Sequence, residues 1–236
     1  MKFLLSIILF TTLNCSMINQ EKNKLGLHYL VRQPKIKIDK PPLLILLHGV
    51  GSNEEDLFSF ADELPGNFLV ISVRAPNSMG TGSYSWYDID FSTGKTIHNT
   101  KLEEKSRAIL IQFISDLKNE FSFDEKRVYL CGFSQGAIMS YGVGLTRPDL
   151  VYGIALMSGR LLNEIKPHIA SKEKLKQLHI FISHGINDQI LNIQDARTSN
   201  SYLKSINLNP TYKEYNEGHG INEEMLIDLI KWLKTN

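Results

Sequence analysis

The chain has 236 residues, of which 42% are hydrophobic and 22% are charged, which is ordinary for a globular protein and long enough for one well-buried domain. Its 26 basic and 25 acidic residues leave a net charge of +1, which argues against nucleic acid, or an electrostatic grip on a membrane, as the principal partner. With two cysteines and no Cys/His cluster of zinc spacing, we expect no structural disulfide, no metal and no cofactor.

The first residues are typical of an export signal. A basic start precedes an apolar run over residues 3–10 that is too short to span a bilayer comfortably. Residues 13–15 resemble a permissive bacterial lipoprotein box, in which Cys15 would become the lipidated first residue, although Asn14 is atypical before that cysteine. We therefore expect a leader over residues 1–15 and a bacterial cell-envelope protein with a membrane tether at Cys15. A periplasmic or secreted protein, or an uncleaved leader acting as an anchor, is the alternative.

Over residues 25–236, strand-like and helix-like runs alternate, which predicts one α/β domain: a mostly parallel central sheet with helices on both faces. Residues 28–31 predict an early edge strand, and the wholly apolar residues 43–47 predict a central strand that is covered on both faces. Ser52 and Glu55 have capping-box spacing, which predicts a helix from there to about residue 64. Later strands are expected near residues 68–73, 127–131, 152–157, 180–183 and 211–215, and later helices near residues 101–121, 135–146, 193–206 and 221–234.

Residues 75–100 lack helical periodicity and are rich in glycine, serine and aromatic residues. A long irregular segment inside a compact domain is often functional. We expect it to form one wall of a substrate groove, with Met79 and Trp86 against the substrate; packing of these side chains onto the core is the alternative. Only one short helix fits between residues 157 and 179, so no large cap domain is expected over the groove.

Residues 132–136, Gly-Phe-Ser-Gln-Gly, fit the G-x-S-x-G pattern, in which a serine lies on a tight turn between a strand and a helix. An apolar run precedes the pentapeptide and a run rich in small residues follows it, as this turn requires. Gly132 and Gly136 allow the backbone to pass close to itself, where a Cβ would clash. Because the pattern also occurs by chance, the assignment of Ser134 as a nucleophile depends on partners elsewhere in the chain.

A reactive serine needs a base within reach and an acid that orients this base, and in one large class of hydrolases the acid and then the base follow the serine. His219 lies between two glycines, where it has no packing role. Asp188 follows the apolar strand 180–183, on a loop at a carboxyl end, where α/β sheets collect functional groups. A solvated loop histidine and a turn aspartate are the alternatives, and Asp149 and Asp195 are less suitably placed acids.

An oxyanion hole usually needs two backbone N–H groups directed at the developing negative charge. Gln135 follows the serine and would supply one of them. The other would come from Val50, in the glycine-rich turn of residues 46–51 after the central strand. Such a turn could instead hold a phosphate, but neither G-x-G-x-x-G nor a Gly-Lys-Ser/Thr signature is present, so that alternative is poor.

With these motifs the chain resembles the carboxylesterase, phospholipase and acyl-protein thioesterase branch of the α/β-hydrolases. The matching segments, in family order over nearly the whole chain after its first two dozen residues, are residues 47–51, 74–76, the region of Trp86, 132–136, 184–188 and 218–220. The resemblance implies an α/β-hydrolase fold in which Ser134 is the nucleophile, Asp188 the acid and His219 the base. The N–H groups of Val50 and Gln135 would form the oxyanion hole. It also implies hydrolysis of small or lipid-like carboxylic esters or thioesters through an acyl-enzyme.

Two positions depart from the family pattern: Ala137 stands where many relatives have a second glycine, and Asn192 replaces a common proline. Neither touches a reacting group, but both leave the substrate preference open. The same residues could cleave peptides, feruloyl-type sugar esters or lysophospholipids. Since a fold does not fix a function, a non-catalytic envelope binding protein on this scaffold is the alternative from outside the enzymes.

Overall fold

The structure is a computed structural model that describes residues 19–21, 25–90 and 97–236. The expected leader of residues 1–15, with the lipidation at Cys15, lies outside the described residues and stays a prediction. Within the described ranges, no helix combines the length and the apolar character that crossing a bilayer requires.

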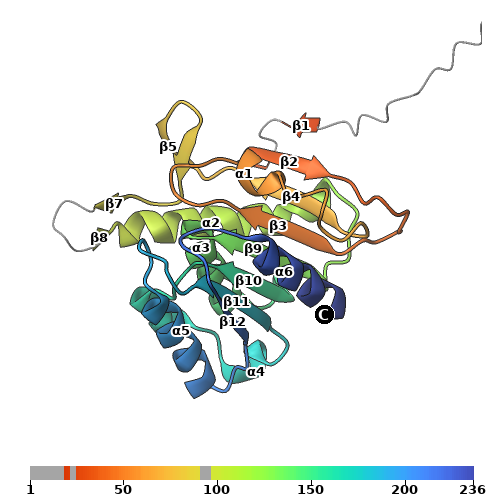
Figure 1. Cartoon of the computed structure of the whole chain (residues 1–236). Helices are drawn as coiled ribbons and strands as arrows, with labels where there is room; N and C mark the ends of the chain where they lie inside the picture. Colours follow the sequence, from red (N-terminus) through yellow and green to blue (C-terminus); the bar gives the residue numbers. More distant parts are fainter. Residues whose placement is uncertain (1–18, 22–24, 91–96) are drawn as a thin grey trace, which may run out of the picture.

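The strands of the main sheet are β1 (Asn19–Glu21), β2 (Tyr29–Arg32), β3 (Leu43–Leu47), β4 (Leu69–Val73), β9 (Val128–Phe133), β10 (Gly153–Met157), β11 (His179–Gly185) and β12 (Thr211–Tyr215). These eight described strands lie in the order β1-β2-β4-β3-β9-β10-β11-β12 (Figure 1). β2 pairs antiparallel with β1 and β4, and all other neighbours are parallel. The mostly parallel sheet is therefore confirmed. The strand expected at the edge over residues 28–31 lies one place inside, because β1 pairs with its outer side.

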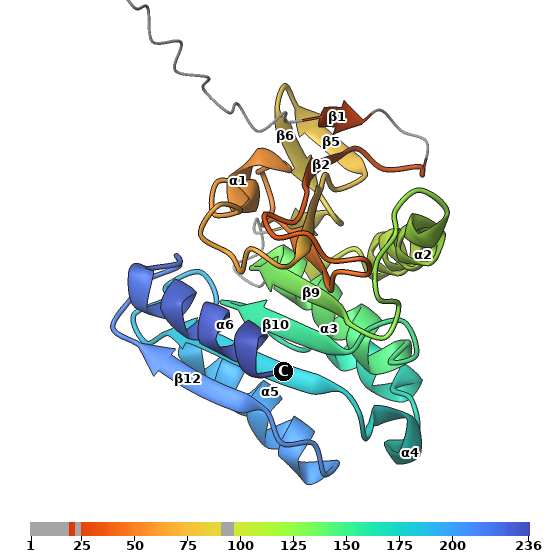
Figure 2. The same cartoon turned by 90° about the vertical axis from the view of Figure 1, so that its right-hand side faces the viewer.

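The helices are α1 (Glu55–Phe58), α2 (Thr100–Asp116), α3 (Gln135–Thr146), α4 (Lys172–Leu175), α5 (Ile193–Ser205) and α6 (Glu223–Thr235), with the short 3₁₀ segments η1 (Leu117–Asn119) and η2 (Asn163–His168). They cover both faces of the sheet, as Figure 2 shows: α1 and α6 lie on one side, and α2 and α3 on the other. Successive side chains of β3 point to opposite faces of the sheet, and this explains the two layers. Leu43, Ile45 and Leu47 belong to the hydrophobic cluster of α2, α3 and α5, whereas Leu44 and Leu46 belong to that of α1 and α6.

The predicted capping box is wrong. The side-chain oxygen of Asn53 accepts from the Glu55 N–H (2.8 Å), and the Ser52 hydroxyl instead donates to the Asp56 carboxylate (2.9 Å). The helix is correspondingly short, because α1 ends at Phe58 and turns carry the chain onward. Local spacing identified a helix start here, but the N-cap is Glu54 and makes no side-chain capping hydrogen bond, because the Ser52 and Asn53 side chains bond elsewhere.

Two small hairpins build the segment predicted to be irregular. β5 (Asn77–Gly80) pairs with β6 (Ser83–Ser85), and β7 (Ile89–Asp90) pairs with β8 (Ile97–His98). The β5–β6 hairpin projects from the body of the molecule in Figure 1. Between β10 and β11 lie two short helical segments, η2 and α4, rather than the single one expected. Neither forms a large cap, so the carboxyl edge of the sheet stays uncovered by a separate domain.

Candidate active site

Ser134 lies at the sharp turn between β9 and α3. Its backbone has φ 53° and ψ −115°, a region that residues other than glycine adopt only when their surroundings impose it. A Cβ on Gly132 would come 2.2 Å from the Gly136 carbonyl oxygen, and a Cβ on Gly136 would come 2.0 Å from the Leu47 carbonyl oxygen. The Ser134 N–H donates to the Met157 carbonyl (2.9 Å). Close backbone contact therefore requires both glycines and fixes the serine above the ends of β3 and β10.

The structure brings the three predicted side chains together from the ends of different strands. The Ser134 hydroxyl lies 2.9 Å from Nε2 of His219, and Nδ1 of His219 lies 2.7 Å from Oδ2 of Asp188. A carboxylate only accepts hydrogen bonds, so Nδ1 carries the proton of the neutral ring and Nε2 accepts from the serine hydroxyl. Asp188 is buried, while the His219 side chain is 17% exposed. This line of hydrogen bonds can remove a proton from the hydroxyl as it attacks an electrophile.

The two less favoured acids have other partners. Asp149 forms an ion pair with Arg147 (2.7 Å), and Asp195 forms one with Arg160 (3.6 Å). Neither hydrogen-bonds to His219 in the described structure. Among these three aspartates, Asp188 is the one that hydrogen-bonds to His219.

His184 lies in the matching segment 184–188, but its sequence context predicts no role for it. The structure places its ring against the acid. Its ring is fully buried, with Nε2 2.7 Å from the Leu191 carbonyl and 3.2 Å from Oδ2 of Asp188. Because a carbonyl oxygen only accepts, Nε2 carries the proton and donates it to the Leu191 carbonyl. The other carboxylate oxygen accepts from the Ile190 and Leu191 N–H groups, at 2.8 and 2.9 Å. Two backbone N–H groups therefore hold one oxygen of the acid, while the His184 ring lies beside the other, which His219 contacts.

The turn that contains Val50 lies beside the serine, since a Cβ on Gly49 would come 3.3 Å from the Ser134 Cβ. His48 orients this turn. Its Nε2 accepts from the Ala75 N–H (3.0 Å), so its Nδ1 carries the proton and donates to the Gly49 carbonyl (2.7 Å). In a trans peptide the Val50 N–H points opposite to the Gly49 carbonyl, and therefore away from the His48 ring. Burial lowers the pKa of His48 below its ordinary value, which keeps this ring neutral.

Gln135 is the first residue of α3, so its N–H has no acceptor within the helix and is free to serve an external oxygen. Its side chain is buried and hydrogen-bonds to the backbone of two consecutive residues. Oε1 accepts from the Trp86 N–H (2.7 Å), and Nε2 donates to the Tyr87 carbonyl (2.7 Å). The two amides proposed for an oxyanion hole thus belong to segments that side-chain hydrogen bonds hold in place.

Trp86 does not contact a substrate groove, and that expectation is wrong. Its side chain is fully buried, and its indole N–H donates to the His48 carbonyl (3.0 Å). The ring therefore packs into the core, as the alternative predicts. Its indole N–H supports the turn that precedes Val50. Met79, on the β5–β6 hairpin, is 56% exposed, and its place in a groove stays a prediction.

Both departures from the family pattern are accommodated locally. A Cβ on residue 159 would come 2.4 Å from the Ala137 Cβ, so the methyl group of Ala137 fits because Gly159 faces it. Asn192 is the N-cap of α5, where its side-chain oxygen accepts from the Gln194 N–H (2.9 Å). The asparagine starts this helix with a hydrogen bond that a proline could not make.

Comparison with known proteins gives a consistent picture. Residues 31–236 match the family model described as Phospholipase/Carboxylesterase. Carboxylesterase SOBER1 of Arabidopsis thaliana is 25% identical over 207 residues, covering 81% of this chain and 89% of that protein. Acyl-protein thioesterase 1 of Yarrowia lipolytica is 25% identical over 216 residues, covering 82% and 91%. The crystal structure of the Bacillus cereus carboxylesterase has a TM-score of 0.78 at 22% identity, covering 90% and 95%, and shares the fold.

Proposed function

Because the chain belongs to the phospholipase/carboxylesterase family of the α/β-hydrolases, a group of esterase-type hydrolases, we propose that Ser134, His219 and Asp188 are its catalytic residues. The observation that carries this proposal is the unbroken line of hydrogen bonds from the serine hydroxyl through the imidazole to a buried carboxylate. The reaction is hydrolysis of a carboxylic ester or thioester through an acyl-enzyme. The substrate class is small-molecule or lipid-like esters.

In the proposed mechanism, Nε2 of His219 takes the proton of the Ser134 hydroxyl while Oγ attacks the acyl carbonyl carbon. Asp188 stabilises the imidazolium that forms. The N–H groups of Val50 and Gln135 donate to the oxyanion of the tetrahedral intermediate. Collapse of this intermediate breaks the bond to the alcohol or thiol, which leaves with the proton from the imidazolium. Water then attacks the acyl-enzyme with the same base, and the carboxylic acid leaves.

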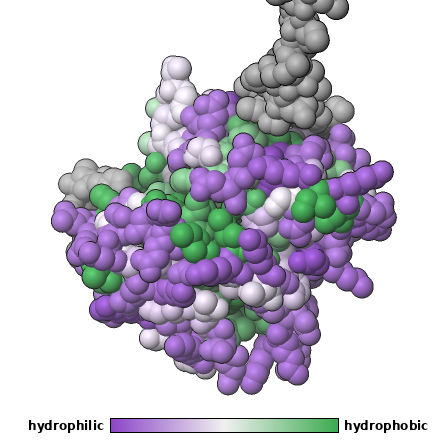
Figure 3. Space-filling model, turned by 45° about the vertical axis from the view of Figure 1, so that its right-hand side comes forward, coloured by the Kyte–Doolittle hydropathy of each residue, from purple (hydrophilic) through white to green (hydrophobic). Residues whose placement is uncertain are grey.

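The surroundings of the serine support an open site. Val50, Ile186 and Ile190 are exposed apolar residues on the two loops that carry the oxyanion turn and the acid. Elsewhere on the molecule, Figure 3 shows a face on which hydrophilic residues predominate and hydrophobic ones form separate patches. With no large cap over the site, we expect the rate to rise smoothly as a substrate concentration passes its critical micelle concentration. A sharp jump at that concentration would contradict an open site.

Purified protein and its Ser134→Ala variant, assayed against a series of para-nitrophenyl esters of increasing acyl length and against a lysophospholipid, test the proposal. Wild type should hydrolyse the short esters and be labelled by a fluorophosphonate probe, and the variant should do neither. Arg147→Gln, which changes a surface ion pair, is the matched control and should behave as wild type. Labelling that persists at another serine would overturn the assignment, and ligand binding without any hydrolysis would favour a binding protein.

Location in the cell envelope, with a lipid on Cys15, is part of the same proposal and is supported by the sequence of residues 1–15. Mass spectrometry of the N-terminus of the protein isolated from its own cells tests this. A lipid-modified Cys15 supports the proposal. An N-terminus that retains residue 1 contradicts it.

A further inference from the structure

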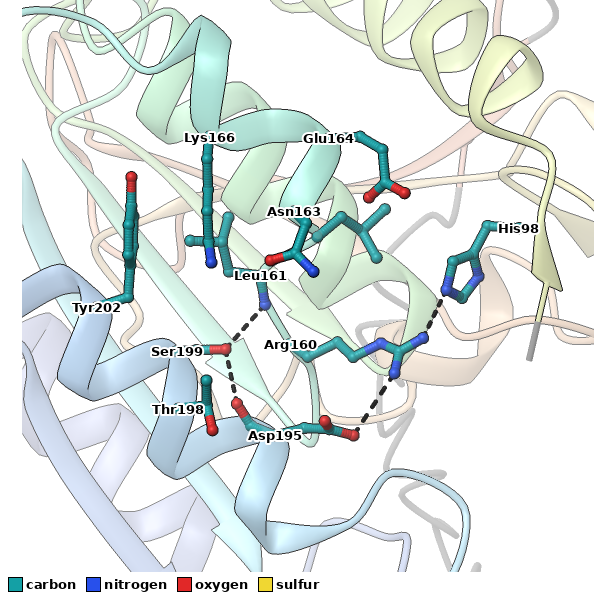
Figure 4. A pocket seen from close by; sticks show the side chains of 11 residues that line it. His98, Arg160, Leu161, Asn163, Glu164, Lys166, Asp195, Thr198, Ser199 and Tyr202 are labelled. Atoms are coloured by element: carbon teal, nitrogen blue, oxygen red, sulfur yellow. Dashed lines mark hydrogen bonds and ion pairs between the residues drawn. The ribbon is translucent and has the colours of Figure 1, made fainter. Parts of the chain in front are cut away.

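A cavity of about 290 Å³ lies between β8, the segment from the end of β10 into η2, and α5 (Figure 4). Most of the side chains that line it are polar or charged, and Leu161, Leu162 and Tyr202 are the exceptions. Burial of an acyl chain against so many polar groups would leave these groups without partners, so this is not an acyl site. Its polar lining is suited to a polar ligand instead.

Each wall of the cavity is tied to the proposed active site. Arg160 follows shortly after Met157, whose carbonyl accepts from the Ser134 N–H. α5 begins directly after the loop of Asp188. The His98 ring packs edge-on against Tyr87, with 5.9 Å between the centroids, and the Tyr87 carbonyl accepts from the Gln135 side chain. If one end of a substrate were held in this cavity, the part outside the cavity would therefore lie at the same edge of the sheet as the serine.

Two buried donors on Arg160 and His98 have no acceptor. A guanidinium nitrogen of Arg160 lies 2.5 Å from Nε2 of His98, and a guanidinium only donates, so Nε2 accepts and the ring proton is on Nδ1. Burial, and then the charge of Arg160, lowers the pKa of His98, in agreement with a neutral ring. Nδ1 of His98 and Nε of Arg160 are both buried, and neither has a partner in the described part of the chain. These two N–H groups are available to a ligand that brings acceptor oxygens.

The charges in the cavity indicate the kind of acceptor. Arg160 has one loose ion pair, 3.6 Å from Oδ2 of Asp195, which leaves most of its fork of donors unused. The Lys166 ammonium lies 4.4 Å from the centroid of the Tyr202 ring, and no carboxylate of the described residues pairs with it. Glu164 also lines the cavity, but it is exposed to solvent and forms no ion pair with a cation of the described residues. Two cations and two carboxylates line the cavity, so its formal charge is balanced, and the unused donors of Arg160, rather than a net charge, favour an anion over a neutral polyol.

We propose that this cavity binds an anionic group of the ester substrate, a carboxylate or a phosphate, with Arg160 as its principal partner and His98 and Lys166 as further donors. The substrate class is then an ester that carries a negative charge away from the bond that is cleaved. The inference rests on the proposed esterase function for its link to the reaction. Binding at the cavity itself can be measured without hydrolysis.

The test is isothermal titration calorimetry of the full chain with succinate, inorganic phosphate and glucose at constant ionic strength. Succinate or phosphate should bind, the tighter of the two identifying the natural anion, and glucose should not. Arg160→Gln should weaken anion binding at least about 10-fold, as expected when a charged hydrogen-bonding partner is lost. Asp195→Asn should strengthen it several-fold, because the competing carboxylate is gone. Arg147→Gln, a surface arginine outside the cavity, should leave it unchanged.

The opposite signs of the two cavity variants protect the test from misfolding, since a damaged protein would lose binding in both. No binding of either anion, equal binding by Arg160→Gln, or weaker binding by Asp195→Asn would overturn the proposal. Glucose binding that Asp195→Asn weakens would identify a polyol site instead. If para-nitrophenyl acetate is not hydrolysed while the anion titrations behave as described, the esterase proposal fails and the anion site stands.

Discussion

The turn around Ser134 and the cavity beside it satisfy their polar groups differently. Around the serine, both ring nitrogens of His48 and both ends of the Gln135 amide have partners. In the cavity, Arg160 and His98 each keep a buried N–H with none. A group that stabilises a transition state must be positioned before the substrate arrives, so the supports of the proposed oxyanion donors are paired, although Nδ1 of His184, beside the acid, has no partner among the described residues. A group that recognises a ligand needs unused donors, so the difference separates the catalytic part of the site from the part that selects.

The largest expected effect is the loss of the base. His219→Ala should lower kcat on the order of 10⁴- to 10⁶-fold, as the loss of a triad histidine does in other serine hydrolases, because no other side chain of the described residues hydrogen-bonds to the Ser134 hydroxyl. Steady-state kinetics with para-nitrophenyl acetate measures it. His168→Gln, an exposed histidine on η2, is the matched control and should change nothing. A loss of less than about 10-fold would remove His219 from the mechanism.

Gly136→Ala tests whether steric contact fixes the catalytic turn. The new Cβ would lie 2.0 Å from the Leu47 carbonyl oxygen, so β3 and α3 would have to separate. We expect activity to fall at least about 100-fold, because misplacement of reacting groups by an ångström has that effect. Thermal unfolding should show a lower midpoint as well. Gly66→Ala places its Cβ 3.4 Å from a flexible lysine side chain and should be close to neutral.

Replacing His48 tests the support of the oxyanion turn without changing a reacting group. His48→Phe removes the hydrogen bond to the Gly49 carbonyl, so the Val50 N–H loses its fixed direction. We expect kcat to fall about 10- to 100-fold, less than for the outright loss of an oxyanion donor, with KM little changed. His48→Asn, which can restore one donor, should recover part of kcat. Equal activity in all three proteins would show that the turn is held by its backbone alone.

The smallest effect is on stability at mildly acidic pH. Burial lowers the pKa of both His48 and His98 below 6.5, so each native ring binds fewer protons than the unfolded chain does. The free energy of unfolding should therefore be constant through these groups above about pH 7 and fall as the pH drops below 6.5, by at most about 1.4 kcal/mol per pH unit for each ring. Urea titrations between pH 7 and 5 measure the slope. His98→Gln should make this dependence on pH less steep. A free energy of unfolding that increases as the pH falls would contradict both assignments.

Patterns read along the chain predicted the elements whose causes are local. The helix expected over residues 135–146 has those bounds, because a glycine-bounded turn starts it and a run of small and apolar residues continues it. The prediction for the helix after Ser52 is wrong because the helix begins later, with Glu54 as an N-cap that makes no side-chain capping hydrogen bond, and the Asn53 side chain accepts from the Glu55 N–H. The prediction that Trp86 lines a groove fails because aromatic residues in an irregular segment are ambiguous, and only the tertiary structure shows that the ring is buried with its N–H on the His48 carbonyl.

The sequence by itself determined the order of the strands and helices and the pentapeptide turn, and with them the serine, the acid and the histidine that the fold brings together. Periodicity and glycine placement act over a few residues, so they are visible without coordinates. Only the tertiary structure decided that His48 and His184 brace the reacting groups, and that His98 and Arg160 meet across 62 residues of chain. Such pairings depend on which strands become neighbours in the sheet, and nothing in the local spacing of these residues specifies that.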